Sequence, residues 1–258
     1  MKNKKTYVVT GAASGIGAET CINLKAKGAL VIGIDRNKTS NADKFYQADL
    51  SDPGSIDQLI DELPIGIDGL ANIAGLPPTA PAESVIKVNI VGLKRLTLGL
   101  VNKIVDGGSI VNLASLAGFG WTDSIEQVKA TLALDFQNDI SLFCQNNDLD
   151  KDGRSYFLAK EALIVWTMQN RWTWRDRGIN MNAVSPGAVD TPILGEFLKS
   201  LGDRAEEDMR VLDRPATPAD IAPVVAFALS DEAKWFRGAN LTADGGMYPH
   251  VMSNVHGF

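Results

Sequence analysis

The sequence has few of the residues that would indicate a metal centre, a disulfide-linked fold or a membrane protein. It contains two cysteines and two histidines in 258 residues. The cysteines form no C-x-x-C pair, so the sequence predicts neither a disulfide nor a zinc site. No apolar run approaches the roughly 20 residues that span a bilayer. The Lys-rich N-terminus leads directly into a predicted strand, without the apolar segment of a signal peptide. We therefore expect a cytoplasmic protein that holds no metal and has no membrane partner.

Positive charge and linker sequence are also scarce. The 25 Lys and Arg residues are outnumbered by 31 Asp and Glu, for a formal net charge of −6. This balance gives no basic surface for nucleic acid. Repeats, low-complexity blocks and Pro/Ser-rich linkers are absent. At this length, residues 1–258 are predicted to form a single domain.

Short apolar runs alternate with helical patterns along the chain. We predict strands at residues 6–10, 29–35, 44–49, 69–73, 109–113, 180–184 and 240–243. Predicted helices between them cover about 15–28, 53–63, 82–104 and 218–229, with a long helix before residue 178. Strands separated by single helices pair in parallel with right-handed crossovers. The predicted fold class is α/β, with one doubly wound parallel sheet of the Rossmann type and helices on both faces.

A glycine-rich turn follows the first predicted strand. In the segment from Thr10 to Gly17 (TGAASGIG), Gly11 permits a sharp turn, Gly15 lets backbone approach a phosphate, and Gly17 lets the next helix pack closely. The N-terminus of that helix offers free N–H groups and a partial positive charge to a pyrophosphate. The spacing is G-x-x-x-G-x-G, a variant of the usual dinucleotide fingerprint.

The second predicted strand ends in Asp35, followed by Arg36. A carboxylate at this point can accept hydrogen bonds from the adenosine ribose and would repel a 2′-phosphate, which favours NAD over NADP. Arg36 leaves an alternative open, because a guanidinium can pair with that phosphate or stack on the adenine.

Tyr156 and Lys160 lie one helical turn apart on one face of a predicted helix. This pattern also fits two solvated residues, but after the glycine-rich turn it indicates oxidoreductase chemistry. A free tyrosine has a pKa near 10. An ammonium beside it and a positive nicotinamide would favour the phenolate, so Tyr156 could act as general base. Ser115 would hold the substrate oxygen against it.

In these motifs and their order, nearly the whole chain resembles the short-chain dehydrogenase/reductase family. The likeness extends to Asn72-Ile73-Ala74-Gly75, to Pro186-Gly187 with Thr191, and to Asp244-Gly245-Gly246. Within the family, the nearest likeness is to a bacterial branch of coniferyl-alcohol and 3α-hydroxysteroid dehydrogenases. The resemblance implies a homodimer or homotetramer.

The resemblance implies roles for individual residues. The implied catalytic set is Asn89, Ser115, Tyr156 and Lys160, with Asn89 placing a water in the proton path and Lys160 also binding the nicotinamide ribose. The expected NAD-binding residues are Gly11, Ser14, Gly15, Ile16, Gly17, Asp35, Arg36, Asp49, Leu50, Asn72, Ala74, Gly75, Tyr156, Lys160, Pro186, Gly187, Val189 and Thr191.

The chain departs from the family pattern between its catalytic serine and tyrosine. Ser115 and Tyr156 stand much farther apart than is usual, and residues of about 121–154 show apolar side chains at roughly helical spacing. Two interpretations of this helical insert stay open, and both can hold: a surface or subunit-contact element, and a lid or pocket wall.

Apolar side chains from three segments could converge above the nicotinamide and select a bulky apolar alcohol, either aromatic, steroid or alicyclic terpene. The expected substrate-binding residues are Ser115, Phe119, Trp121, Tyr156, Leu194 and Phe197. Two other functions remain open: an NADPH-dependent carbonyl reductase, and a dinucleotide-binding regulator without turnover.

Overall fold

The computed structural model describes residues 4–39, 41–191, 194–195 and 210–258. Within them, a seven-stranded parallel sheet has the order β3-β2-β1-β4-β5-β6-β7. The strands are β1 (Thr6–Thr10), β2 (Leu30–Asp35), β3 (Lys44–Gln47), β4 (Ile67–Asn72), β5 (Ile104–Leu113), β6 (Asn180–Pro186) and β7 (Asn240–Ala243). This arrangement confirms the predicted fold class.

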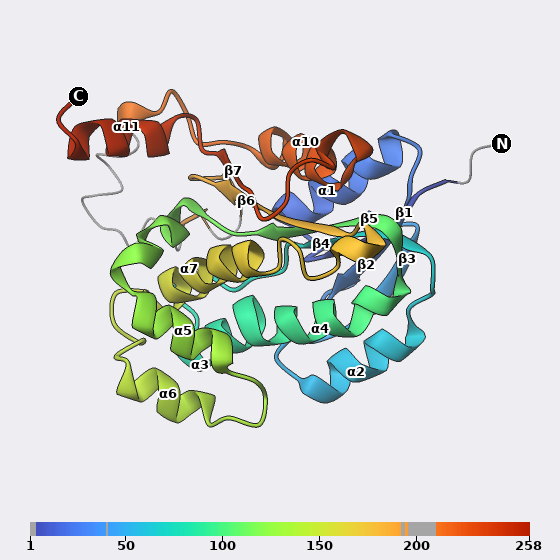
Figure 1. Ribbon diagram of the computed structural model, residues 1–258, viewed down its shortest axis with the longest axis horizontal. Helices are drawn as coiled ribbons and strands as arrows, with labels where there is room; N and C mark the ends of the chain where they lie inside the picture. The colour runs from blue at the N-terminus through green and yellow to red at the C-terminus, as the bar shows by residue number, and fades with distance from the viewer. Residues whose placement is uncertain (1–3, 40, 192–193, 196–209) are drawn as a thin grey trace.

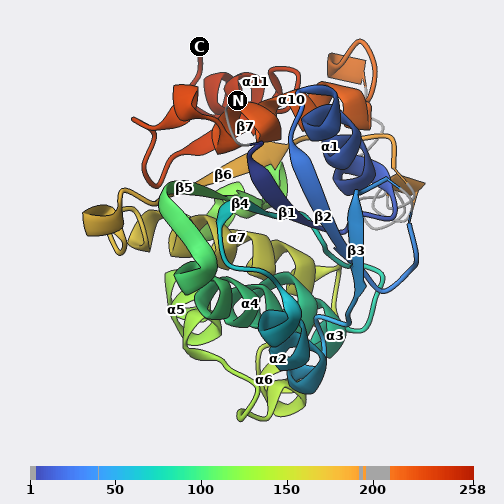
Figure 2. The same cartoon turned by 90° about the vertical axis from the view of Figure 1, so that its right-hand side faces the viewer.

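Helices cover both faces of the sheet (Figures 1 and 2). On one face lie α1 (Gly15–Ala26) and α10 (Pro218–Leu229). On the other lie α2 (Pro53–Glu62), α3 (Ala82–Ile86), α4 (Leu93–Leu100) and α7 (Arg154–Gln169). Each face has its own buried apolar cluster. The central strands are buried on both sides, which explains their nearly continuous apolar sequence.

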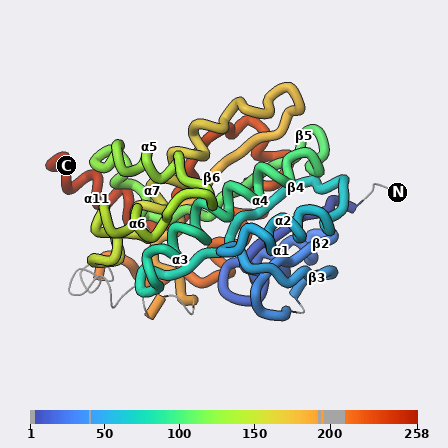
Figure 3. Tube along the Cα trace, turned by 90° about the horizontal axis from the view of Figure 1, so that it is seen from below, coloured from blue at the N-terminus to red at the C-terminus, as the bar shows by residue number. Residues whose placement is uncertain are grey.

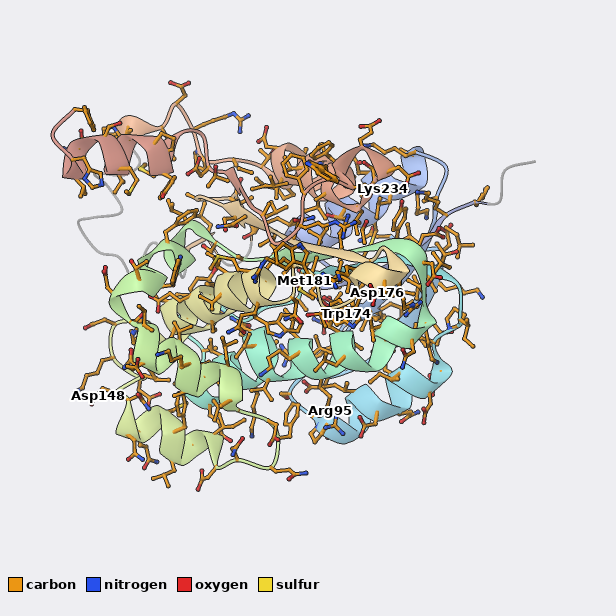
Figure 4. All side chains as sticks on the ribbon, viewed as in Figure 1. Arg95, Asp148, Trp174, Asp176, Met181 and Lys234 are labelled. Carbon is orange, nitrogen blue, oxygen red and sulfur yellow. The ribbon has the colours of Figure 1, made fainter. Side chains whose placement is uncertain are left out.

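Local sequence signals set several helix ends. Asp52 accepts a hydrogen bond from the Gly54 amide at 3.0 Å, with Pro53 at the first helical position of α2. Farther along α2, Asp57 accepts two hydrogen bonds from Arg95 on α4, at 2.7 and 2.6 Å, in a bidentate salt bridge (Arg95 is labelled in Figure 4). These contacts fix the outer pair of helices on this face.

The helix predicted over 82–104 forms, but its hydrogen-bond pattern changes along its length. After α3 the chain forms a π-helical segment, η1 (Lys87–Gly92), then α4, and then a 3-10 turn, η2 (Val101–Lys103). β5 begins at Ile104, five residues before the predicted start. The π-helical segment coincides with Asn89, whose side chain bonds backbone outside the helix, as described below.

The insert contains two short helices. A 3-10 segment, η3 (Leu116–Asp123), leads into α5 (Ile125–Ala133) and α6 (Ile140–Asn146). α5 packs against α7 and α6 packs against α3, with α6 at the bottom of the view in Figure 1 and nearest the viewer when the molecule is seen from below (Figure 3). The remaining elements are η4 (Arg175–Arg177), η5 (Asp231–Ala233) and a C-terminal helix, α11 (Met247–Val255), which the sequence analysis did not predict.

In the described part of the chain, no helix has the length and apolar character needed to cross a membrane. The same residues contain no group of three or more His, Cys, Asp or Glu side chains placed to hold a metal ion.

Candidate active site

The predicted site residues gather at the carboxyl ends of the parallel strands. The glycine-rich turn follows β1, Asp35 ends β2, and Ala74 and Gly75 follow β4. Ser115 comes shortly after β5. The strand order reverses between β1 and β4, which is where ligands bind in open α/β sheets.

The backbone of the glycine-rich turn leaves no room for side chains. Gly11 and Gly15 have φ values of +72° and +52°, in the left-handed region that favours glycine. A Cβ on Gly11 would lie 3.0 Å from the Ala74 backbone, and one on Gly17 would lie 2.0 Å from the Gly11 carbonyl oxygen. The turn therefore packs α1 directly behind β1, with the N-terminus of α1 open toward the strand ends.

A cavity of about 370 Å³ lies beside this turn. Asp35 stands in its wall, and its carboxylate accepts the Ala13 amide at 3.0 Å and the Asn37 amide at 2.9 Å. The carboxylate thus fixes the turn to the end of β2. The predicted cofactor residues that line the cavity are Gly11, Ser14, Gly15, Ile16, Gly17, Asp35, Arg36, Asp49, Leu50, Ala74, Gly75 and Thr191.

A second cavity of about 110 Å³ continues from the first toward Ser115. The two cavities share the lining residues Ile16, Ile73, Gly75, Leu76, Leu113 and Thr191. The predicted site residues in its wall are Ile16, Gly75, Ser115, Tyr156, Lys160, Pro186, Gly187, Val189, Thr191 and Leu194. Together the cavities form an elongated site.

The shape of this site fits a dinucleotide. A Cβ on Gly15 would lie 3.2 Å from the Thr191 methyl group, a tight contact between two residues that line the first cavity. The acidic end at Asp35, the free amides of the α1 N-terminus and the reactive side chains follow one another in the order of adenosine, pyrophosphate and nicotinamide. The residues present therefore fit NAD or NADP.

Ser115, Tyr156 and Lys160 converge at the far end. Lys160 is 5% exposed, and its ammonium donates to the Leu113 carbonyl at 2.6 Å. It also lies 5.5 Å from the centroid of the Tyr156 ring. Ser115 precedes η3, and its hydroxyl accepts the Ala117 amide at 3.2 Å. A hydroxyl, a phenol and an ammonium from two elements therefore face one small cavity.

Burial is the largest influence on the pKa values of both titrating groups in this site. It raises the pKa of Tyr156 above its usual value, and the hydrogen bond with Ser115 opposes that rise. It lowers the pKa of Lys160 to about 8, because the charged form loses its hydration. The sequence analysis expected Lys160 and the nicotinamide to lower the Tyr156 pKa. In the protein itself, burial outweighs the opposing interactions, and the pKa of Tyr156 is raised.

Asn89 forms a reciprocal pair with the loop after β4. Its carbonyl oxygen accepts the Leu76 amide at 2.7 Å, and its amide donates to the Leu76 carbonyl at 3.0 Å. Asn89 is 1% exposed and lies within the π-helical segment. The π-bulge aims this amide at Leu76, which lines both cavities. Asn89 thus braces the wall of the site.

Asn72 belongs to a buried polar chain and lines neither cavity. Its amide donates to Thr97 and to Asn112, both at 2.9 Å. The Asn112 amide continues to Thr167 at 2.9 Å. This chain ties β4 and β5 to α4 and α7, so Asn72 orients the helix that carries Tyr156 and Lys160.

Thr10 has a role that the sequence analysis missed. Its hydroxyl accepts the amides of Ile73 at 2.9 Å and Ala74 at 3.0 Å. It therefore joins the loop after β4 to the glycine-rich turn. A β-branched hydroxyl at the end of a strand gives no signal of this in the sequence, because the partner is 63 positions away.

The predicted substrate residues divide into three groups. Leu194 lines the second cavity, whereas Phe119 and Trp121 line neither cavity. Phe119 contacts Tyr248 of α11, with ring centroids 4.1 Å apart. Phe197 lies outside the described residues. Of the described residues in the insert, none lines either cavity. In this structure the insert therefore packs behind the site and does not form its wall.

Comparison with known proteins agrees with this geometry. Residues 5–125 match a family model described as short chain dehydrogenase, and residues 143–248 match one described as Enoyl-(Acyl carrier protein) reductase. A coniferyl-alcohol dehydrogenase from a Pseudomonas species is 44% identical, covering 96% of this chain and 97% of that protein. A 3-alpha-hydroxysteroid dehydrogenase/carbonyl reductase from Comamonas testosteroni is 28% identical over 93% of this chain and 95% of that protein.

A solved structure gives the same result. The 3-alpha-hydroxysteroid dehydrogenase from Pseudomonas sp. B-0831, complexed with NADH, aligns with a TM-score of 0.81 at 31% identity and covers 96% of this chain and 99% of that one. The glycine-rich turn, the converging Ser, Tyr and Lys, and these whole-length similarities show that the chain belongs to the short-chain dehydrogenase/reductase family.

Proposed function

We propose that the protein is an NAD-dependent alcohol dehydrogenase that oxidises a bulky apolar alcohol of the aromatic, steroid or alicyclic terpene class. The observation that carries this proposal is the placing of Ser115, Tyr156 and Lys160 in one cavity that continues from the dinucleotide-shaped one. A regulator without turnover would not need all three. Strands from both halves of the chain form one sheet, which supports residues 1–258 acting as a single domain.

The reaction requires that the alcohol lose a hydride from carbon and a proton from oxygen. NAD, when bound, supplies the hydride acceptor. Ser115 donates a hydrogen bond to the alcohol oxygen and holds it beside Tyr156. The Tyr156 phenolate accepts the proton as general base, and the Lys160 ammonium stabilises that phenolate. Burial strengthens this electrostatic coupling, because the effective dielectric constant is low. In reduction, the phenol returns the proton.

The apolar part of the substrate would contact Leu76, Val189 and Leu194 in the wall of the second cavity. Burial of apolar area contributes about 25 cal/mol per Å², whereas the unpaired hydroxyls of a sugar are costly to bury. The 44% identical relative bears the name coniferyl-alcohol dehydrogenase. We therefore place a phenylpropenol first among the candidates.

A panel of alcohols tests the substrate class. We expect NADH formation to be fastest with coniferyl alcohol, a 3-hydroxysteroid or a cyclic terpenol, and slow with glucose and ethanol. Initial rates at matched concentrations give kcat/KM for each alcohol. Best activity on glucose or ethanol would contradict the apolar pocket, while leaving alcohol oxidation in place.

Cofactor preference follows from Asp35. Its carboxylate would repel a 2′-phosphate, so NAD should exceed NADP in kcat/KM by at least about tenfold, or 1.4 kcal/mol. Asp35→Ala should narrow that gap. Because it also removes the bond to the Ala13 amide, efficiency with NAD should fall as well. Equal efficiency with both cofactors in the wild type would refute the assignment and favour an NADPH-dependent reductase.

A further inference from the structure

The insert contacts the helix that carries the catalytic residues. α5 packs on α7, and α6 packs on α3. Val128, Ile140 and Leu149 are at most 3% exposed and belong to the same buried cluster as the sheet. Asp148 marks the outer end of the insert (Figure 4). These buried side chains anchor the insert to the core, and it can act on the site only through the residues that it contacts.

Glu161, the residue after Lys160, joins the insert to α7. Its side chain is 5% exposed. Arg154 donates to both carboxylate oxygens, at 2.7 and 2.8 Å, and the Ser124 hydroxyl donates to one of them at 2.5 Å. Arg154 also donates to Gln127 on α5 at 2.9 Å. We call Ser124, Arg154 and Glu161 the clasp.

A buried carboxylate is costly unless several donors satisfy it. The three donated bonds on Glu161 meet that requirement, and they also restrict how the joined segments can move. Replacing Glu161 alone would leave the half-buried Arg154 guanidinium without its carboxylate partner, so the loss of Glu161 would change stability as well as positioning. The Ser124 bond can be removed without touching the ion pair, and it is the bond that ties the end of η3 to Glu161 on α7.

Ser124 ends the segment that begins at the catalytic serine. η3 lies against α7, with Ser115 directly before it and Ser124 directly after it. In its middle, the Gly118 amide donates to the Ser115 carbonyl at 2.9 Å, and a Cβ on Gly118 would lie 2.7 Å from the Lys160 carbonyl oxygen. η3 is therefore attached to β5 at one end and to Glu161 at the other, with α7 directly beneath.

The other side of the clasp lies at the start of α7. Arg154 is its first residue, and Tyr156 comes two residues later. Gly153 has a φ of +67°, and a Cβ there would lie 2.7 Å from Cβ of Pro78. Pro78 follows Pro77, which lines the cofactor cavity. The turn that carries Tyr156 is thus held between this loop and the clasp.

We propose that Ser124 and Glu161 are positioning residues that hold η3 and the first turn of α7 at fixed positions relative to each other. These positions set the spacing between the Ser115 and Tyr156 hydroxyls, between which the alcohol oxygen must fit. A misplacement of about 1 Å can reduce a rate roughly 100-fold. The inference rests on the proposed function only because alcohol oxidation is one of its two measurements.

The first measurement is kinetic. In Ser124→Ala the Arg154–Glu161 pair remains, and we expect kcat for the best alcohol to fall about tenfold, because the reacting groups lose their fixed spacing. KM for NAD and the Kd for NADH should stay within about twofold, since the clasp lies outside the cofactor cavity. Ser124→Thr keeps the hydroxyl and should restore most of the rate. Lys129→Ala is the matched control, because it removes an exposed ion pair with Glu126 on the same helix.

The second measurement needs no substrate. Amide hydrogen exchange in η3, measured with NADH present, should be faster in Ser124→Ala than in the wild type, Ser124→Thr or Lys129→Ala. Wild-type kcat with wild-type exchange in Ser124→Ala would overturn the proposal. An equal loss of rate and Tm in both Ser124 variants would also overturn it, because the clasp would then only stabilise the fold. If the wild type oxidises no alcohol, the proposed function fails and hydrogen exchange alone decides the role of the clasp.

Discussion

Tyr156→Phe should remove nearly all alcohol oxidation while leaving NADH binding close to that of the wild type. General base catalysis is typically worth about 10²–10⁴-fold, so kcat should fall at least about 100-fold. The phenylalanine ring fills the same space in the second cavity, and dinucleotide affinity should depend little on the missing hydroxyl. Steady-state rates with the best alcohol and fluorescence titration with NADH measure the two effects separately.

Lys160→Ala provides the contrast for this experiment. Lys160 contacts the Leu113 carbonyl and lies over the Tyr156 ring, so its loss should reduce both the rate and the affinity for NADH. Its pKa is lowered to about 8 by burial, so at neutral pH the ammonium still predominates and can stabilise the phenolate. If Tyr156→Phe kept more than about a tenth of the wild-type rate, another group would have to be the base.

The fold was predictable from the sequence because its central strands are buried on both faces. Residues 6–10 form β1 with the predicted bounds, and the strand predicted at 180–184 begins where predicted and ends two residues later, at Pro186. Buried parallel strands need continuous apolar residues, and glycines or helix caps mark where they end. The predicted positions of the glycine-rich turn, Asp35 and Ser115 at the strand ends followed from that pattern.

Features that depend on side-chain contacts across the fold were not predictable. The helix predicted over 82–104 contains a π-helical segment at Asn89, whose side chain bonds the backbone of Leu76, a partner 13 residues away that no periodicity reveals. The helical spacing in the insert was recognised, but the break between α5 and α6 and the contacts that hold them were not. The clasp joins residues 30 and 37 positions from Ser124, and charged residues on a helix usually indicate a solvated face.

The roles of individual residues show the same limit. Ser115, Tyr156 and Lys160 were predicted because the family pattern gives their order, and the structure brings them to one cavity. Asn72 was expected at the cofactor, but its side chain bonds Thr97 on α4 and Asn112 on β5. An amide at the end of a strand can serve a ligand or the core, and only the positions of its partners distinguish the two.

Gly17→Ala should weaken NADH binding by at least about tenfold. The added Cβ would lie 2.0 Å from the Gly11 carbonyl oxygen, so the glycine-rich turn or α1 must move. Overpacking of this kind typically costs about 1–3 kcal/mol, and each 1.4 kcal/mol is a factor of ten in affinity. The turn that shifts is the one whose backbone would hold the pyrophosphate, so the strain is expressed in the Kd for NADH as well as in the Tm.

Gly54→Ala is the matched control, because it makes the same substitution in a helix with space for the methyl group. The nearest atom to a Cβ on Gly54 is a carboxylate oxygen of Asp52 at 3.5 Å, an ordinary contact. Alanine is also the better helix former, so the Tm should hold or rise, and the Kd for NADH should not change. Wild-type affinity for NADH in Gly17→Ala would show that the pyrophosphate does not lie on this turn, and the cofactor would then have to be placed elsewhere along the strand ends.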